Sequence, residues 1–433
     1  MPPLSPPTHP ASPPAPRHRP FARHFVWLSL ASLILQIIPV RVAAEERPLA
    51  AGMESTVPLL PGGPAMKVFL PSNYQPARTW PVVFFYHGAG GSPDTTWVRR
   101  LTDERDFIVA AMPYVAEGTS AGTSLERGDR LKSEHRAFQH ALKWLAANAR
   151  VDESSVFLAG ISKGGWTAGS LWEMDPARVK GLIILLAGRQ PGPSPESAAM
   201  RGRPVYIGAG ESDPNLLPAM RARLHYRQCG ALVCFDVFEG IGHQTPADPV
   251  RLRLWLRVHG LARQEDSDAA AFAEEFTAAL AETDVLKQYR KLQLLSDDPR
   301  TPGADPAVLA AARVRFAELK QRSPAKEEWQ AESRLGEILV LEGRIRSLAE
   351  MKTVLDGFQS IAQAYPGTRC GALAADHIPA VADAYAKSLE ATRAANPAAR
   401  PQPAVTPSFP SAGRGRGDYP FPVREGNTIK FKR

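Results

Sequence analysis

Hydrophobic residues follow two different patterns along the 433 residues, and the change comes near residue 262. Before this point, short apolar runs are separated by loops, which is typical of strands buried on both faces of a parallel sheet. The clearest runs are 81–86, 156–161, 181–186 and 204–207. After it, from 268 to about 395, apolar residues recur at helical spacing, as in Phe272, Phe276 and Leu280. We therefore expect a doubly wound, mostly parallel α/β sheet over 45–262, followed by an all-α helical module over 263–395.

The predicted helical module contains about four to six amphipathic helices, with a break at the prolines of 299–306. Within it, 358–372 is similar to a tetratricopeptide-like junction, in which Tyr365-Pro366 ends one helix and Thr368 caps the next. Three repeats in register are not found in the sequence. Two roles stay open for the module: a stabilising domain packed on the sheet, or a surface that binds a protein partner.

The most informative motif is Gly160-Ile-Ser162-Lys-Gly164, which closes one of the apolar runs. In a turn from a strand into a helix, the two glycines let the chain bend sharply, and Ser162 is raised above the sheet. A serine at a helix N-terminus lies beside free backbone N–H groups, which can stabilise an oxyanion. A serine chosen only for packing is the alternative, and the neighbouring motifs favour a nucleophile.

A glycine-rich loop, His87-Gly-Ala-Gly-Gly91, follows the first of these strands. The loop resembles the H-G-G-G type that donates one backbone N–H to an oxyanion hole, which implies Ala89 or Gly90 as one donor and Lys163, the residue after the nucleophile, as the other. We expect His87 itself to pack or hydrogen-bond beneath the loop. A Ser–Lys dyad is not expected, because adjacent side chains at a helix start point apart.

An acid and a base follow the serine in the chain. The strand at 204–207 leads to Asp213 in G-x-x-D spacing, and the next predicted strand leads to His243, which follows a glycine. Glu211 and Asp236 are the competing candidates for the acid. A serine hydroxyl is a poor nucleophile at neutral pH, so His243 would accept its proton while Asp213 orients the imidazole. Three other histidines lie in helix-like segments and are expected at the surface: His135, His140 and His225.

The elbow, the glycine-rich loop and the chain order Ser162, Asp213, His243 together resemble the α/β-hydrolase superfamily over roughly 55–262. Within it, the chain is most similar to dienelactone hydrolase, carboxylesterase and polyhydroxybutyrate depolymerase-like serine esterases. The resemblance implies an α/β-hydrolase fold and ester hydrolysis through an acyl-enzyme, with no metal and no organic cofactor. Lys163 departs from the Met, Gln or His frequent at this position, but the chemistry needs only its backbone N–H.

The substrate site is expected to be open, because the connection at 187–203 is too short for an inserted lid domain. An open cleft suits bulky or polymeric esters. Trp97 and Trp166 are close in sequence to the glycine-rich loop and the elbow. They are candidate platforms for a sugar or aryl group, with core packing as the alternative for Trp166.

The ends of the chain carry its excess positive charge. The formal net charge is +8, and the basic termini account for it, which leaves 45–411 neutral and argues against a nucleic-acid-binding face. A proline-rich basic segment precedes the apolar run 25–40 and Val42-Ala-Ala44, which predicts a signal peptide over 1–44, cleaved after Ala44, and a secreted or periplasmic protein. An uncleaved membrane anchor over 25–40 is the alternative. The tail, 396–433, is predicted to be disordered.

The three cysteines are compatible with either redox compartment. Cys229 and Cys234 are five positions apart and can form a local disulfide, which would leave Cys370 unpaired.

Two functions from different classes follow from these patterns. The first is an extracytoplasmic serine esterase. The second is an envelope adaptor whose helical module binds a partner and whose hydrolase domain is weak or inactive. A serine peptidase is a lesser alternative, because the same triad can cleave amides.

Overall fold

The computed structural model describes residues 49–59, 62–116, 129–190, 197–261, 266–298 and 305–395. The predicted signal peptide (1–44) and the predicted tail (396–433) lie outside these residues. Among the helices that are described, none is both long and apolar enough to cross a membrane.

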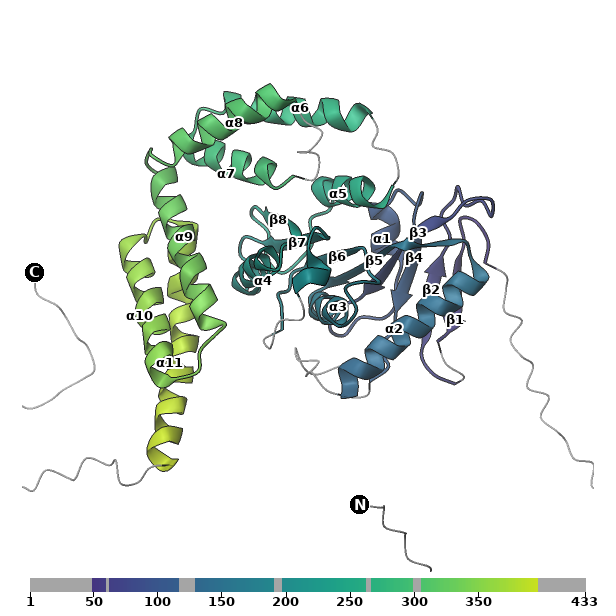
Figure 1. The fold of residues 1–433 in the computed structure, drawn as a ribbon, viewed down its shortest axis with the longest axis horizontal. Coiled ribbons are helices and arrows are strands. Elements are labelled where there is room, and N and C mark those ends of the chain that lie inside the picture. Colours follow the sequence, from purple (N-terminus) through teal and green to yellow (C-terminus); the bar gives the residue numbers. More distant parts are fainter. Residues whose placement is uncertain are drawn as a thin grey trace, which may run out of the picture. The chain divides into compact units, whose positions relative to one another are not determined.

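A sheet of eight strands forms the centre of the described part of 49–261 (Figure 1). The strands lie in the order β1-β2-β4-β3-β5-β6-β7-β8. Strand β2 runs antiparallel to both of its neighbours, and all other neighbouring pairs are parallel. The bounds are β1 (Glu54–Pro58), β2 (Ala65–Phe69), β3 (Trp80–Tyr86), β4 (Ile108–Met112), β5 (Val151–Ile161), β6 (Gly181–Leu185), β7 (Pro204–Gly210) and β8 (Leu232–Phe238).

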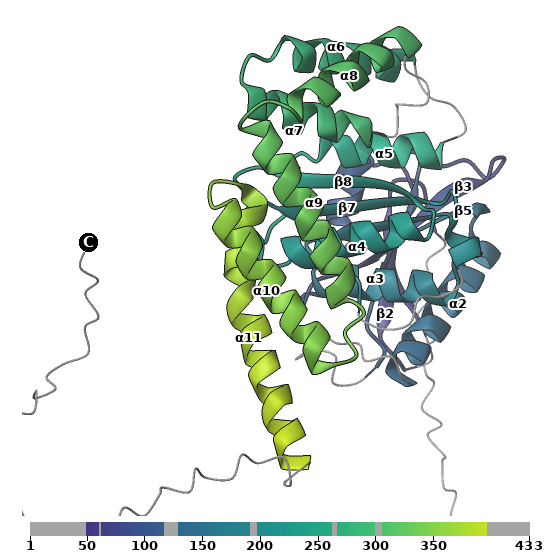
Figure 2. The ribbon, with the colours of Figure 1, turned by 60° about the vertical axis from the view of Figure 1, so that its left-hand side comes forward.

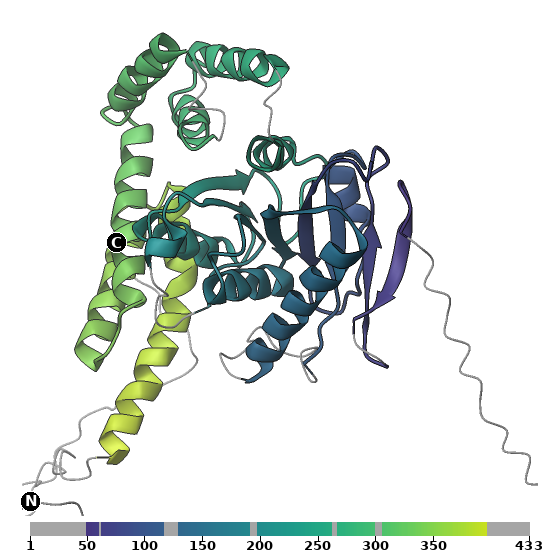
Figure 3. The ribbon, with the colours of Figure 1, turned by 45° about the vertical axis from the view of Figure 1, so that its right-hand side comes forward.

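Helices cover both faces of this sheet (Figures 1 and 3). The reason is visible in β3, where every residue is buried and successive side chains point to opposite faces. Phe84 belongs to the apolar cluster under one helical layer, and Phe85 belongs to the cluster under the other. One layer is α2 (Asp129–Asn148), α3 (Lys163–Met174) and α4 (Leu216–Gln228), and the other is α1 (Thr96–Leu101) and α5 (Val250–Gly260). The prediction of a doubly wound, mostly parallel sheet is confirmed.

The carboxyl ends of the parallel strands meet at one edge of the sheet. Tyr86 at the end of β3 is in register with Gly160 in β5, and Gly210 at the end of β7 is in register with Phe238 at the end of β8. The loops that follow these four strands therefore converge at the edge where open α/β sheets bind ligands.

The described residues beyond α5 form helices, as predicted. They are α6 (Asp266–Ala281), α7 (Val285–Ser296), α8 (Pro306–Leu319), α9 (Ala325–Glu342), α10 (Leu348–Ala364) and α11 (Arg369–Ala395). Helix α10 begins with a capping box between Ser347 and Glu350 and ends at Tyr365. The hydroxyl of Thr368 then accepts the N–H of Gly371 in the first turn of α11.

The helical module packs on the layer that contains α4. Apolar residues of α9, α10 and α11 belong to the same buried cluster as those of α2, α3 and α4, whereas α6, α7 and α8 share a cluster of their own. Helix α9 lies beside α4 (Figure 2), and the added Cβ of an alanine at Gly336 would contact Leu224 at 3.8 Å. At the margin of this contact, Arg223 of α4 donates to Glu332 of α9 at 2.7 Å.

Candidate active site

Ser162 lies in a sharp turn between the last residue of β5 and the first residue of α3. Its backbone angles are φ 53° and ψ −120°, a conformation that residues other than glycine rarely adopt. Both flanking glycines are required by close contacts. A Cβ at Gly160 would lie 2.1 Å from the carbonyl carbon of Gly164, and a Cβ at Gly164 would lie 1.9 Å from the carbonyl oxygen of Tyr86. Any larger residue at either position would push β5, α3 or the end of β3 out of place.

The structure brings Ser162, His243 and Asp213 together from three different loops. The Nε2 atom of His243 lies 2.9 Å from Ser162 Oγ, and its Nδ1 atom lies 2.9 Å from Asp213 Oδ1. The Asp213 side chain is fully buried, whereas 40% of the His243 side chain is exposed. The buried carboxylate of Asp213 is thus in a position to orient the His243 ring, and the contact between His243 and Ser162 is exposed to solvent.

The two competing carboxylates have other partners. Glu211 accepts the backbone N–H of Gly240 at 3.2 Å, and Asp236 accepts the hydroxyl of Tyr206 at 2.7 Å. Asp213 is the carboxylate that contacts His243, and it also accepts the backbone N–H of Asn215 at 2.8 Å.

The glycine-rich loop lies directly against the nucleophile. A Cβ at Gly88 would be 3.6 Å from the Cβ of Ser162. Ala89 and Gly90 follow in an exposed turn, where Gly90 has φ +73°. On the other side of the serine, Lys163 is the first residue of α3, and the N–H groups of a first turn have no intrahelical acceptor. The glycine-rich loop and the first turn of α3 therefore both adjoin Ser162.

The contacts of His87 lie within and beneath this loop. Its Nδ1 atom lies 2.8 Å from the carbonyl oxygen of Gly88. Its own carbonyl oxygen accepts the hydroxyl of Tyr114 at 2.7 Å, and the two rings meet edge to face. Burial lowers the pKa of His87, which favours the neutral ring.

The Lys163 side chain turns away from Ser162 into a buried group that the sequence did not predict. Only 6% of Lys163 is exposed, and its ammonium lies 4.0 Å from the centroid of the Tyr114 ring. Glu134 of α2 is fully buried nearby and accepts the backbone N–H groups of Val115 and Ala116, both at 2.9 Å. Burial lowers the pKa of Lys163, and the charge of Glu134 opposes this shift. Burial likewise raises the pKa of Glu134.

The two tryptophans pack against the apolar clusters. Trp97 stacks on Phe85 with ring centroids 5.8 Å apart, and Trp166 packs against the cluster on the α3 face of the sheet. Both side chains are only partly buried, so these packing contacts leave their role as a substrate platform a prediction.

The expectation that three histidines lie at the surface holds for His140 alone. His135 is half-buried and lies 3.8 Å from Asp175. His225 is also half-buried, with its Nε2 atom 3.6 Å from the Sγ atom of Cys229. Both side chains lie on helix faces that contact other elements, a fact that the local pattern of polar residues did not reveal.

The cysteines are unpaired. Cys229, Cys234 and Cys370 are all buried thiols, so the local disulfide is not formed. In the part of the chain that the structure describes, no group of three or more His, Cys, Asp or Glu side chains could hold a metal ion.

No protein-family model and no curated protein matches the sequence. Similar solved structures include a thermostable esterase, at 18% identity and TM-score 0.34, for which the alignment covers 43% of this chain and 54% of that chain. A CE1 ferulic acid esterase from Anaeromyces mucronatus is 15% identical, with coverage of 44% and 84% and a TM-score of 0.37. A carboxylesterase from Bacillus cereus is 18% identical, with coverage of 42% and 89% and a TM-score of 0.36. The chain thus spans about half of the length of the thermostable esterase.

The order of the strands, with β2 antiparallel and the serine turn between β5 and α3, decides the fold. It is the α/β-hydrolase fold. Ser162, Asp213 and His243 all lie at the carboxyl edge of the sheet in this domain, which comprises the described part of 49–261.

Proposed function

We propose that the chain is a serine hydrolase that cleaves carboxylic esters, with Ser162 as nucleophile, His243 as general base and Asp213 as the acid. One observation carries the proposal: an unbroken contact chain runs from Ser162 Oγ through both nitrogens of His243 to the buried carboxylate of Asp213. A serine hydroxyl needs this partner, because it is a weak nucleophile on its own.

In this mechanism, Ser162 Oγ attacks the ester carbonyl carbon and its proton passes to His243 Nε2. Asp213 accepts the Nδ1–H of His243 and stabilises the imidazolium that forms. When the tetrahedral intermediate collapses, the alkoxy group leaves with the proton from Nε2, and the acyl group stays on the serine. Water, deprotonated by the same nitrogen, then releases the carboxylic acid.

The oxyanion would be held by two backbone N–H groups, one from Lys163 and the other from Ala89 or Gly90. The support for this pair is the position of Lys163 at the start of α3 and the contact between Gly88 and Ser162. Removing one such donor typically costs about 2.7–4 kcal/mol of transition-state stabilisation.

We further propose an open site and bulky or polymeric ester substrates. The support is that 40% of the His243 side chain is exposed. In addition, the described residues between β6 and β7 contain only the single turn Ser197–Met200. We also propose export, on the basis of the apolar run at 25–40 and Val42-Ala-Ala44 in the sequence. Sequencing of the mature N-terminus tests this, and a start at Glu45 is expected.

The deciding experiment for the activity compares Ser162→Ala with a matched control, Ser170→Ala on α3. The hydroxyl of Ser170 donates to the carbonyl of Trp166 within the helix. We expect Ser162→Ala to lower kcat on short p-nitrophenyl esters by a factor on the order of 10⁴ or more while the protein stays folded. Ser170→Ala should retain turnover. A fluorophosphonate probe should label the native protein at Ser162.

Two outcomes would replace the proposal. Folded native protein that neither hydrolyses esters nor reacts with the probe would favour the adaptor hypothesis. Labelled protein that cleaves amides faster than matched esters would favour a peptidase.

A further inference from the structure

Glu211, which competed with Asp213 for the role of the acid, connects the two loops that carry Asp213 and His243. It is the first residue after β7, and its backbone N–H donates to the carbonyl of Phe238 at 2.9 Å. Its Oε2 atom accepts the N–H of Gly240 at 3.2 Å, three residues before His243. The neighbouring Ser212 donates to the carbonyl of Ile241 at 3.0 Å. The position of one loop therefore sets the position of the other.

The second oxygen of Glu211 faces the helical module. Its Oε1 atom lies 3.9 Å from the Nη1 atom of Arg290 on α7. Arg290 lies with Glu211, Ser212 and Asp213 along the same cavity of about 770 Å³, which the turn between α10 and α11 also lines. The loop of the catalytic acid thus lies against the helical module.

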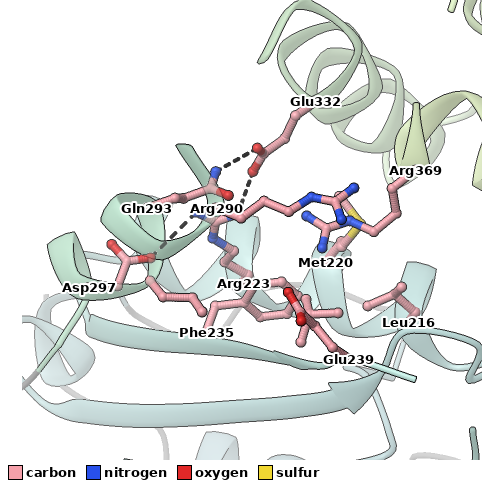
Figure 4. Close-up of a pocket in the computed structure, with 12 residues that line it drawn as sticks. Leu216, Met220, Arg223, Phe235, Glu239, Arg290, Gln293, Asp297, Glu332 and Arg369 are labelled. Carbon is pink, nitrogen blue, oxygen red and sulfur yellow. Dashed lines mark hydrogen bonds and ion pairs between the residues drawn. The ribbon is translucent and has the colours of Figure 1, made fainter. Parts of the chain in front are cut away.

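Arg290 is held in place from within the module. Its Nη2 atom lies 3.4 Å from Glu328 Oε1, and the Glu328 side chain is only 2% exposed. Glu328 also accepts the backbone N–H of Arg369 at 3.1 Å. Figure 4 shows Arg290 and Arg369 extending toward each other in the neighbouring cavity, which Glu239 from the His243 loop also lines. The buried carboxylate of Glu328 thus contacts both Arg290 and Arg369 and restrains the position of the Arg290 side chain.

We propose that Arg290 is a positioning residue for catalysis: by holding the Glu211 carboxylate against Gly240, the helical module keeps Asp213 and His243 in contact. This inference rests on the proposed function of Ser162, His243 and Asp213. The module then contributes to turnover without touching the substrate. The reason is geometric, because displacement of a catalytic group by about 1 Å can reduce the rate by up to about 100-fold.

Three variants test the contact. Arg290→Met removes the cation, Glu211→Ala removes both contacts of the carboxylate, and Glu211→Gln keeps an oxygen for Gly240 but removes the charge. The matched control is Arg221→Ala, which removes another contact between the two domains, the 2.7 Å ion pair with Glu342, a pair that includes neither Glu211 nor Arg290. We expect kcat to fall about tenfold in Arg290→Met and at least as far in Glu211→Ala, with KM within about twofold of the native value. Glu211→Gln should fall between native and Glu211→Ala, and Arg221→Ala should keep the native kcat.

Two further readouts separate positioning from stability. The double variant Arg290→Met with Glu211→Ala should lose no more than Glu211→Ala alone, because both changes disable one device. The low-field proton resonance of the Asp213–His243 hydrogen bond should broaden or disappear in Arg290→Met and stay sharp in Arg221→Ala. This resonance can be recorded even if the native protein turns over no ester, so a failure of the proposed function is distinguishable from a failure of the positioning role. The inference would be overturned if Arg290→Met kept the native kcat and a sharp resonance and showed only a lower unfolding temperature. If Arg290→Met does not fold, a native kcat and a sharp resonance in Glu211→Ala would overturn it instead.

Discussion

Lys163 follows Ser162 directly in the chain, yet its ammonium lies 4.0 Å from the centroid of the Tyr114 ring, in a buried group on the far side of the elbow. Tyr114 in turn donates its hydroxyl to the carbonyl of His87, at the start of the glycine-rich loop. The backbone of Lys163 and its side chain are therefore suited to different tasks. The backbone lies beside the nucleophile, and the side chain stabilises the layer beneath the oxyanion loop.

The first prediction separates these two tasks. Lys163→Met should lower the free energy of unfolding by about 1–2 kcal/mol, because a desolvated cation–π contact is worth roughly that much and a methionine fills most of the same space. Turnover should stay within about tenfold of native, since the backbone N–H is unchanged. Urea unfolding and ester hydrolysis measure the two effects. A loss of turnover above 100-fold in folded protein would mean that the ammonium itself acts in the reaction.

Gly164→Ala is expected to damage both stability and reactivity. The new methyl group would lie 1.9 Å from the carbonyl oxygen of Tyr86, so the elbow and the end of β3 must separate. Overpacking of this severity costs about 3 kcal/mol or more. The matched control is Gly367→Ala, where an added Cβ meets nothing within 4 Å. Urea midpoints and fluorophosphonate labelling should change in Gly164→Ala alone, and native labelling of that variant would contradict the prediction.

Because His259 is buried, we expect the free energy of unfolding to fall in mild acid. Burial, with a smaller contribution from Lys180, lowers the pKa of His259 from 6.5 to about 4. Between these values the unfolded chain binds a proton that the folded chain does not, so stability falls as the pH drops from 6.5 to about 4. The native protein should lose about 3 kcal/mol from this residue over that range. Unfolding of His259→Leu in urea should lack this part of the pH dependence.

The control for this prediction is a change at His140, which is exposed on α2. His140→Leu should show the same acid loss as the native protein. Parallel pH curves for native protein and His259→Leu would contradict the assignment.

The thiols should be unreactive in the folded protein and reducing agents should not change its stability. Burial raises the pKa of Cys234 to about 12 and that of Cys370 to about 12, so almost no thiolate is present at neutral pH. A thiol reagent should detect three thiols per chain in denaturant and react only slowly without it. Detection of a single thiol in non-reducing denaturant would instead indicate a disulfide.

The fold was predictable because its signals are local. A run such as 81–86 is apolar at every position, which is the pattern of a strand covered on both faces, and glycines at 160 and 164 are readable as a sharp turn. The convergence of Ser162, Asp213 and His243 followed from chain order and from the rule that parallel strands end at one edge.

The parts that were missed depend on contacts between distant residues. Asp213 was predicted as the acid and contacts His243, but the contacts of its rival Glu211 with Gly240 and Arg290 were not foreseen. The buried group of Lys163, Tyr114 and Glu134 joins three elements, and no single segment carries a pattern that announces it. The pairing of Arg290 with Glu211 likewise joins α7 to a loop almost 80 positions earlier in the chain.

The arginines of α4 are neutralised almost entirely by carboxylates from later in the chain. Arg223 contacts Glu332 and Asp297, Arg227 contacts Asp297, and Arg221 contacts Glu342. A fragment that ended near residue 261 would keep these arginines and lose every one of those partners. It would expose a strip of unneutralised arginines beside an uncovered apolar face. Binding of such a fragment to polyanions, or its self-association, would therefore result from the loss of the helices and would not be a property of the intact chain.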